Sequence, residues 1–271
     1  MSSFRRKLAR LDRPASGDGA GEAASLDRLR DRLAVALGGS DGATGQSPPA
    51  SHGPGPDSSF RLATTEQATA WGPCHSIVAP YTPSYRVGDT ALCRALGANG
   101  EQLSLLGLTP AVASCDLGRA LYLDTETTGL GTGTGNLPFL IGLCWFDAAA
   151  SRFVLEQLFL RDPDDEVAIL ERVRERVEAC ELIVSYNGKS FDMPVLRNRL
   201  VMNRREPLPP RAQLDLLHLA RRVHARRSWR KSLTVVEREV LGFDRGPDVA
   251  GEDVAERYLD FGSVVEVTVG P

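Results

Sequence analysis

The sequence predicts an α/β fold in which a mixed sheet, made of three antiparallel strands followed by α/β crossovers, is flanked by helices. Apolar runs typical of strands occur at 120–123, 138–146 and 152–160. The second and third runs are separated by a few residues only, a connection of the length that β-hairpins use. Downstream, helical periodicity alternates with a short apolar run at 181–186. This alternation is typical of strands joined by helical crossovers on one sheet.

Four helices are expected in the second half of the chain. The first begins with Asp162 as its N-cap and Pro163 at its first helical position, where the missing N–H of proline costs nothing. Its apolar stripe consists of Val167, Leu170, Val173 and Val177. The other three are expected at 191–202, 214–224 and 231–242. Amphipathic helices of this kind bury one face, so we expect them to pack on the sheet.

Composition divides the chain into four parts. Residues 1–59 are rich in Gly, Ser, Pro, Ala and Asp, which predicts a mostly disordered leader. Residues 60–118 contain short apolar pieces broken by Gly and Pro, and we interpret them as an accessory segment of small strands and turns. Residues 119–261 carry the motifs of the predicted domain, and residues 262–271 form an atypical tail.

Several functional classes are disfavoured by composition. No apolar run approaches the length of about eighteen residues that a membrane helix needs, so we predict a cytoplasmic protein without a membrane partner. The five cysteines are scattered and form no C-x-x-C pair, which argues against zinc and disulfide-redox motifs. The overall charge of −3 does not by itself suggest a polyanionic partner.

Positive charge is nevertheless concentrated in one part of the chain. The segment from Arg197 to Lys231 holds eleven Lys or Arg residues against two acids, Glu206 and Asp215. A basic segment of this kind can follow the phosphates of a nucleic acid. The alternative is that the arginines occupy solvated helix faces, and the charge pattern alone does not decide between the two.

Three acids follow strands in a way that suggests a metal site. Asp124 and Glu126 end the first apolar run, and residues two apart in a strand point to the same face. Asp192 follows the buried run at 181–186 after a short loop, and functional residues of α/β sheets gather at such strand ends. Mg²⁺ and Mn²⁺ prefer carboxylate ligands from more than one element. Each acid taken singly could equally be an N-cap or a solvated carboxylate.

Two competing motifs fail on spacing. The "GKS" at 188–190 resembles the end of a phosphate-binding P-loop, but the glycine required five positions earlier is Ile183. A calcium-binding EF-hand loop that started at Asp124 would need Glu at its twelfth position, where this chain has Gly135. The glycines at 129–135 do not form G-x-G-x-x-G either, and they suit a tight turn or a close approach of backbone to ligand.

Five blocks of sequence resemble a known family. These blocks are "YLDTETTGL", "GTGTGNLPFLIG", "VSYNGKSFDMPVLRNR", "LDLLHLARR" and "SLTVVEREVLGFDR". On these blocks the chain between residues 119 and 258 is similar to the YprB-type ribonuclease H-like domain, a branch of the DEDD exonuclease superfamily. The resemblance implies a ribonuclease H-like sheet, with Asp124 and Glu126 as the first acidic motif and Asp192 as the acid of the second.

The resemblance also implies a function. Relatives that cut nucleic acid remove nucleotides from the 3′ end of single strands, so we expect a 3′–5′ exonuclease that uses two Mg²⁺ or Mn²⁺ ions. Asp124, Glu126 and Asp192 would be the catalytic residues and metal ligands. Thr127, Asn187 and Phe191 would contact the substrate strand, and Asp215 matches an aspartate that packs near the site. DNA and RNA remain equally open as substrates.

The last motif of the family is absent from the printed sequence. In the family a His-Asn pair, followed by Asp, comes after the block that is "ERYLDF" here, whereas this sequence reads "GSVVEVTVGP" after Phe261. The missing groups are a general base and a fourth metal ligand. We therefore expect a chain truncated before this motif. The alternative function is a non-catalytic nucleic-acid-binding module or an inactive copy of the enzyme.

Overall fold

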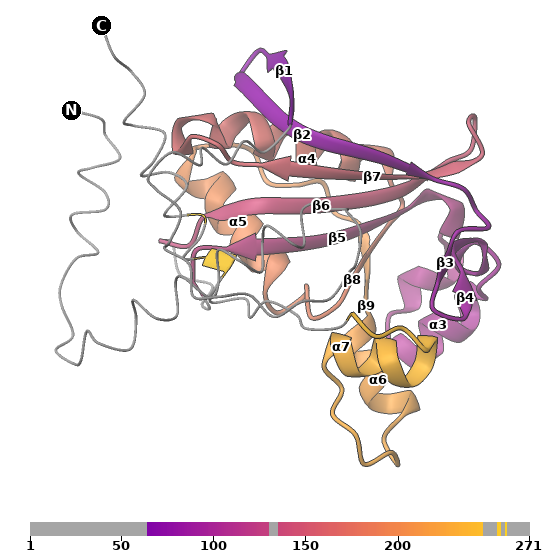
Figure 1. Ribbon diagram of the computed structural model, residues 1–271. Coiled ribbons are helices and arrows are strands. Elements are labelled where there is room, and N and C mark those ends of the chain that lie inside the picture. The colour runs from indigo at the N-terminus through magenta and orange to yellow at the C-terminus, as the bar shows by residue number, and fades with distance from the viewer. Residues whose placement is uncertain (1–63, 130–134, 246–253, 256–257, 259–271) are drawn as a thin grey trace, which may run out of the picture. The chain divides into compact units, whose positions relative to one another are not determined.

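The central feature of the fold is a seven-stranded mixed sheet. The structure is a computed structural model, and it describes residues 64–129, 135–245, 254–255 and 258. The strands of this sheet are β1 (Thr65–Thr69), β2 (Gly72–Tyr81), β5 (Ala120–Thr127), β6 (Pro138–Asp147), β7 (Arg152–Phe159), β8 (Leu182–Ser185) and β9 (Ala212–Asp215). Their order is β1-β2-β7-β6-β5-β8-β9 (Figure 1). The predicted mixed α/β sheet is confirmed.

Strand direction brings three strand ends to one edge of the sheet. β5, β6 and β7 form the predicted antiparallel meander, and Asp147 closes its second turn by accepting a hydrogen bond from the Ala150 N–H. β8 pairs with β5 in parallel, and β9 pairs with β8 in parallel. The carboxyl ends of β5, β8 and β9 therefore lie at the same edge, which is where open α/β sheets place their ligands.

The segment at 60–118 contributes two strands to the main sheet. β2 pairs antiparallel with β7 from His75 to Tyr81, and β1 forms the outer edge beside β2. The same segment contains a small hairpin of β3 (Arg86–Val87) and β4 (Thr90–Ala91), helix α3 (Gly100–Gly107) and three 3₁₀ turns. The expected small strands and turns are present, with one helix in addition. The leader at 1–59 and the tail at 262–271 lie outside the described residues.

The helices agree with the sequence pattern except at one boundary. They are α4 (Glu166–Ala179), α5 (Asp192–Met202), α6 (Leu216–Val223) and α7 (Leu233–Val236), the last continued by a π-helical turn at Glu237–Leu241. Asp162 caps a 3₁₀ turn that leads into α4. The expectation of a helix from residue 214 was wrong at its start, because β9 ends at Asp215 and α6 begins after it. A strand of four residues is too short to show a period.

The sheet separates two apolar cores. Leu121 and Leu123 of β5 belong to the larger core, which α4 and α5 cover. Ala120 and Tyr122 point to the smaller core, which includes residues of α3, α6 and a 3₁₀ turn. Alternation along β5 therefore assigns its odd-numbered residues to the α4 and α5 side and its even-numbered residues to the α3 and α6 side.

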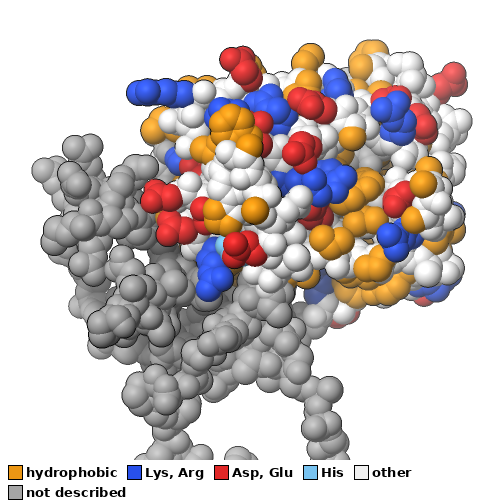
Figure 2. Space-filling view, turned by 90° about the horizontal axis from the view of Figure 1, so that it is seen from above, with side chains coloured by type: hydrophobic (Ala, Val, Ile, Leu, Met, Phe, Trp, Pro, Cys, Tyr) orange, Lys and Arg blue, Asp and Glu red, His pale blue; other side chains and the backbone are white. Residues whose placement is uncertain are grey.

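Part of the basic segment serves the fold rather than the surface. Arg199 forms a buried ion pair with Glu166, and Arg205 pairs with Glu171 while stacking on Trp71. On the face shown in Figure 2, positive and negative side chains are interspersed rather than gathered by sign. Among the described residues, no helix has both the length and the apolar character needed to cross a membrane.

Candidate functional site

The first two predicted acids lie at the carboxyl end of β5. Asp124 is exposed and Glu126 is half-buried, and both follow the even-numbered register of Tyr122. The pairing of β5 with β6 is regular up to Glu126 and is irregular between Glu126 and Thr127, because the partner changes from Leu140 to Pro138. The acids therefore occupy the last regular positions of the strand, at the edge where β8 also ends.

The third predicted acid reaches this edge from a helix. Asp192 is the first residue of α5 and is only 3 % exposed. Its Oδ1 accepts a hydrogen bond of 2.5 Å from the Thr125 hydroxyl, which joins the helix start to β5. Thr125 stands between Asp124 and Glu126 in the sequence and points to the opposite side of the strand. The structure thus brings Asp192 to the same strand end as the first acidic motif.

The negative charge of Asp124 affects the protonation of Asp192. The pKa of Asp192 is raised to about 6, chiefly by burial; the hydrogen bond from Thr125 acts in the opposite direction, and the charge of Asp124 adds to the rise. Asp124 keeps contact with solvent, yet desolvation by the surrounding protein raises its pKa, while the Arg245 guanidinium lowers it. The result is a pair of carboxylates whose ionised forms repel each other.

A divalent cation fits this pair of carboxylates. Carboxylate oxygens are the donors that Mg²⁺ and Mn²⁺ prefer, and a cation would remove the repulsion between Asp124 and Asp192. Within the described part of the chain, no three His, Cys, Asp or Glu side chains are placed as a ready-made metal cage. Two of the three predicted ligands are therefore coupled in the structure, and the role of Glu126 and the two-ion arrangement stay predictions.

The loop between β8 and α5 holds Asp192 in place. Asn187 adopts a left-handed backbone conformation with φ of 70°, and its carbonyl accepts hydrogen bonds from the N–H groups of Ser190 and Phe191. The Gly188 carbonyl accepts from the Met193 N–H, inside the first turn of α5. This compact turn fixes the direction in which the helix leaves the sheet.

Asp215 organises the same loop from the neighbouring strand. It is 2 % exposed at the end of β9, and its carboxylate accepts hydrogen bonds from the N–H groups of Asn187, Lys189 and Leu217 at 2.9, 3.1 and 3.0 Å. A carboxylate that accepts several backbone hydrogen bonds is firmly anchored. Asp215 therefore contacts the loop that leads to Asp192, and these contacts are with backbone groups.

We expect Gly188→Ala to destabilise the protein and to displace Asp192. A Cβ at position 188 would lie 2.4 Å from Ser185 Oγ and 2.9 Å from Asp192 Oδ2, closer than atoms can approach without movement. The expected loss in the free energy of unfolding is about 1–3 kcal/mol, as for other overpacked sites. Urea denaturation measures it. Gly135→Ala is the matched control, because a Cβ there meets nothing within 4 Å; equal effects of the two substitutions would contradict the packing argument.

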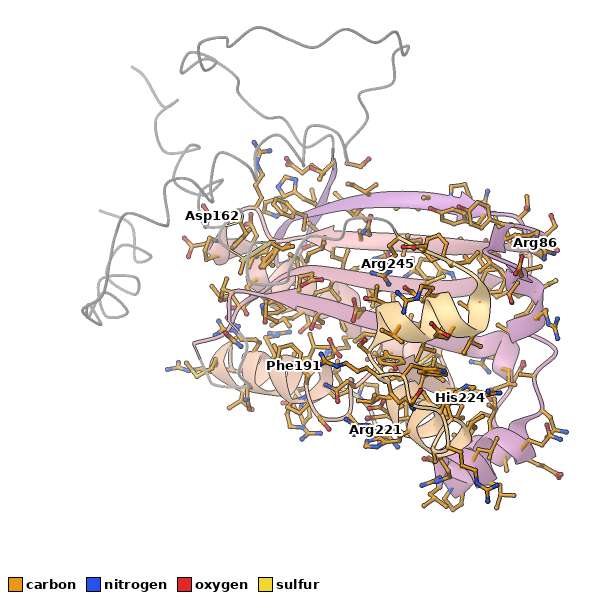
Figure 3. The ribbon with its side chains drawn as sticks, turned by 60° about the horizontal axis from the view of Figure 1, so that its bottom comes forward. Arg86, Asp162, Phe191, Arg221, His224 and Arg245 are labelled. Atoms are coloured by element: carbon orange, nitrogen blue, oxygen red, sulfur yellow. The ribbon has the colours of Figure 1, made fainter. Side chains whose placement is uncertain are left out.

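The predicted substrate-contacting residues have different surroundings. Asn187 and Phe191 lie in the loop that leads into Asp192, and Figure 3 shows Phe191 at the start of α5. Thr127 is buried, and its hydroxyl donates to the Gly129 carbonyl at 2.6 Å. The roles of the three residues in substrate binding stay predictions.

Sequence reasoning missed three residues that shape the site. Thr125 binds Asp192, Gly188 leaves room for it, and Arg245 places a positive charge near Asp124. The position of Thr125 between two acids at a strand end was an available signal. No sequence signal indicated the position of Arg245, because that position depends on how the chain after α7 returns to the sheet.

Comparisons with known proteins agree with the fold. A family model described as the RNase H superfamily matches residues 121–264, a range that includes Asp124, Glu126, Asp192 and Asp215. The chain is also 39 % identical over 142 residues to the uncharacterized protein YprB of Bacillus subtilis (strain 168). That match covers 52 % of this chain and 34 % of the relative, so the chain spans about a third of the relative's length. The chain belongs to the RNase H superfamily.

Proposed function

We propose that the protein is a metal-dependent nuclease that hydrolyses phosphodiester bonds of nucleic acid. The observation that carries the proposal is the coupling of Asp124 and Asp192, two carboxylates from different elements at one edge of the sheet. A buried carboxylate next to a second carboxylate of like charge is costly for a fold and is typical of functional sites. Membership of the RNase H superfamily supports the same reaction.

Each residue of the site has a proposed task. Asp124 and Asp192 hold a Mg²⁺ or Mn²⁺ ion, and Glu126 completes its ligands directly or through water. Such an ion supplies a hydroxide-generating water and stabilises charge on the reacting phosphate. Thr125 orients Asp192, and Asp215 keeps the intervening loop in position. A second ion, as the resemblance to DEDD exonucleases implies, belongs to the same proposal.

The finer activity that we propose is removal of nucleotides from the 3′ end of a single strand. Phe191 directly precedes Asp192, and Asn187 lies in the same short loop, so a strand end that reaches the cation also reaches these residues. Phe191 is half-buried, and its exposed part is available for contact with a base.

A second candidate function rests on one observation. The described residues hold two coupled acids but no three-ligand cage, which favours a module that binds nucleic acid without cutting it. In this second candidate function, a protein with the same fold binds nucleic acid but does not hydrolyse it.

Incubation of the full chain with 5′-labelled single-stranded DNA or RNA tests the proposal. With Mn²⁺ we expect a ladder of labelled products that shortens from the 3′ end, and with EDTA we expect none. Large internal fragments without a ladder would support a nuclease but contradict the 3′–5′ direction. Intact oligonucleotide in both Mn²⁺ and Mg²⁺, despite measurable binding, would replace the proposal with the second candidate.

A further inference from the structure

A group of exposed arginines lies beside the loop that carries Asp192. We use the term basic arm for residues 221–231, which run from the end of α6 to the residue before Ser232. Its exposed arginines are Arg221, Arg222, Arg226, Arg227 and Arg230. Figure 3 shows Arg221 and His224 on the α6 side of the molecule. The arm contains no acidic residue.

The start of the basic arm is fixed to the site loop. Asp215 accepts the Leu217 N–H as the N-cap of α6 and, with the same carboxylate, binds the N–H groups of Asn187 and Lys189. Arg222 donates to the Leu106 carbonyl, which ties the end of α6 to α3. The helix that carries the arm and the loop that carries Asp192 therefore share one buried anchor.

The far end of the arm is fixed to the same place. The Tyr186 hydroxyl donates to the Lys231 carbonyl at 2.5 Å, and Tyr186 follows the last residue of β8 directly. Within the arm, the Lys231 ammonium lies 4.4 Å from the Trp229 ring centroid and donates to the Arg227 and Trp229 carbonyls. The His224 ring lies 4.9 Å from the Trp229 ring. The arm is thus held at both ends and internally, and within the described ranges Arg222 is its one arginine whose side chain takes part in these contacts.

The charge of the arm is not neutralised by neighbouring acids in the described part of the chain. There, Arg221, Arg226, Arg227 and Arg230 form no ion pair, whereas the paired arginines of α4 and α5 contact glutamates, namely Glu156, Glu166, Glu171 and Glu175. Uncompensated positive charge held at a fixed place is suited to a polyanion. Ion pairing ties the paired arginines into the fold, and it does not account for these four.

We propose that the basic arm binds the phosphate backbone of single-stranded nucleic acid and holds the strand while its end lies at Asp124 and Asp192. The inference rests on the proposed function for the identity of the polyanion. Its support is the shared anchoring, because Asp215 and Tyr186 link the arm to the loop that presents Asp192. Contacts to phosphates are independent of base sequence, so the arm contributes affinity and position rather than sequence preference.

Fluorescence anisotropy of the full chain with 5′-labelled oligo(dT) and oligo(U) tests the proposal, in EDTA so that the probes stay intact. Arg226→Ala/Arg227→Ala removes two charges from the arm. The matched control is Arg94→Ala/Arg152→Ala, which removes two exposed charges outside the arm, on a 3₁₀ turn and at the start of β7. Thermal denaturation of each variant verifies that it is folded.

The expected result is weaker binding by the arm variant on both probes. The slope of log Kd against log salt concentration should fall by about 1.4, since each lost single-strand phosphate contact removes about 0.7. The control should keep the slope and Kd of the parent. Equal weakening in both variants, an unchanged slope in the arm variant, or no binding by the parent would overturn the proposal. Arm-dependent binding without any cleavage would instead remove the nuclease function and leave the arm's role intact.

Discussion

Asp124→Asn is expected to lower the rate of Mn²⁺-dependent cleavage on the order of a thousandfold, because the cation loses one of the two coupled carboxylates that hold it. The substitution keeps the size of the side chain and removes its charge. Folding should be preserved, since Asp124 is exposed and the strand pairing around it is made by backbone groups. Initial rates on a labelled single strand, with parent and variant at equal concentration, measure the loss.

Asp147→Asn is the control for this loss. Asp147 ends β6 at the opposite edge of the sheet, and its Oδ1 accepts the Ala150 N–H, a bond that asparagine retains. We expect the control to cleave at the rate of the parent. Cleavage by Asp124→Asn within a few-fold of the parent would show that the reaction does not depend on this carboxylate, and the proposed site would be wrong.

Asp192→Asn is expected to have opposite effects on stability and on activity. The folded-state pKa of Asp192 is raised to about 6 from the model-compound value of 3.8. The folded state therefore binds more protons than the unfolded state between these values, so the free energy of unfolding falls as pH rises through about 4 to about 6. Near neutral pH and without metal, the ionised Asp192 side chain lowers the free energy of unfolding by up to about 3 kcal/mol. Asparagine removes this cost and still accepts the Thr125 hydrogen bond.

Urea denaturation in EDTA near pH 4 and near pH 7 measures this effect. We expect the free energy of unfolding of the variant to be about 1–3 kcal/mol higher than that of the parent near pH 7. Near pH 4, where Asp192 is protonated in the folded protein, the two values should be equal. Cleavage by the variant should be lost. A parent that is at least as stable as the variant at both pH values would contradict the raised pKa.

The strands and helices that form the centre of the fold were predictable because their patterns are local. The runs that became β6 and β7 are long and joined by a short turn, and α4 has a clear apolar stripe. β9 was missed because a strand of four residues is too short to show an alternating pattern of apolar and polar residues. The addition of β1 and β2 to the edge at β7 was not predicted either, because it depends on pairing between distant segments.

The acids of the candidate site could be predicted from the sequence, but the contacts that surround them could not. Strand ends indicated Asp124 and Asp192, since side chains there share one edge of the sheet. The hydrogen bond from Thr125 and the charge of Arg245 depend on tertiary contacts that no spacing rule encodes. The basic segment also proved to be of two kinds. Arg199 and Arg205 are paired within the fold, whereas the basic arm is exposed.

Calorimetric titration of Mn²⁺ into the full chain near neutral pH tests the central claim most directly, because it measures the proposed shared cation site of Asp124 and Asp192 without requiring turnover. The parent and Asp147→Asn should bind Mn²⁺ with equal affinity. Asp124→Asn and Asp192→Asn should each weaken binding on the order of tenfold or more, since each removes a charged ligand. Binding by both site variants with the affinity of the parent would contradict the account, because the cation would then be held elsewhere.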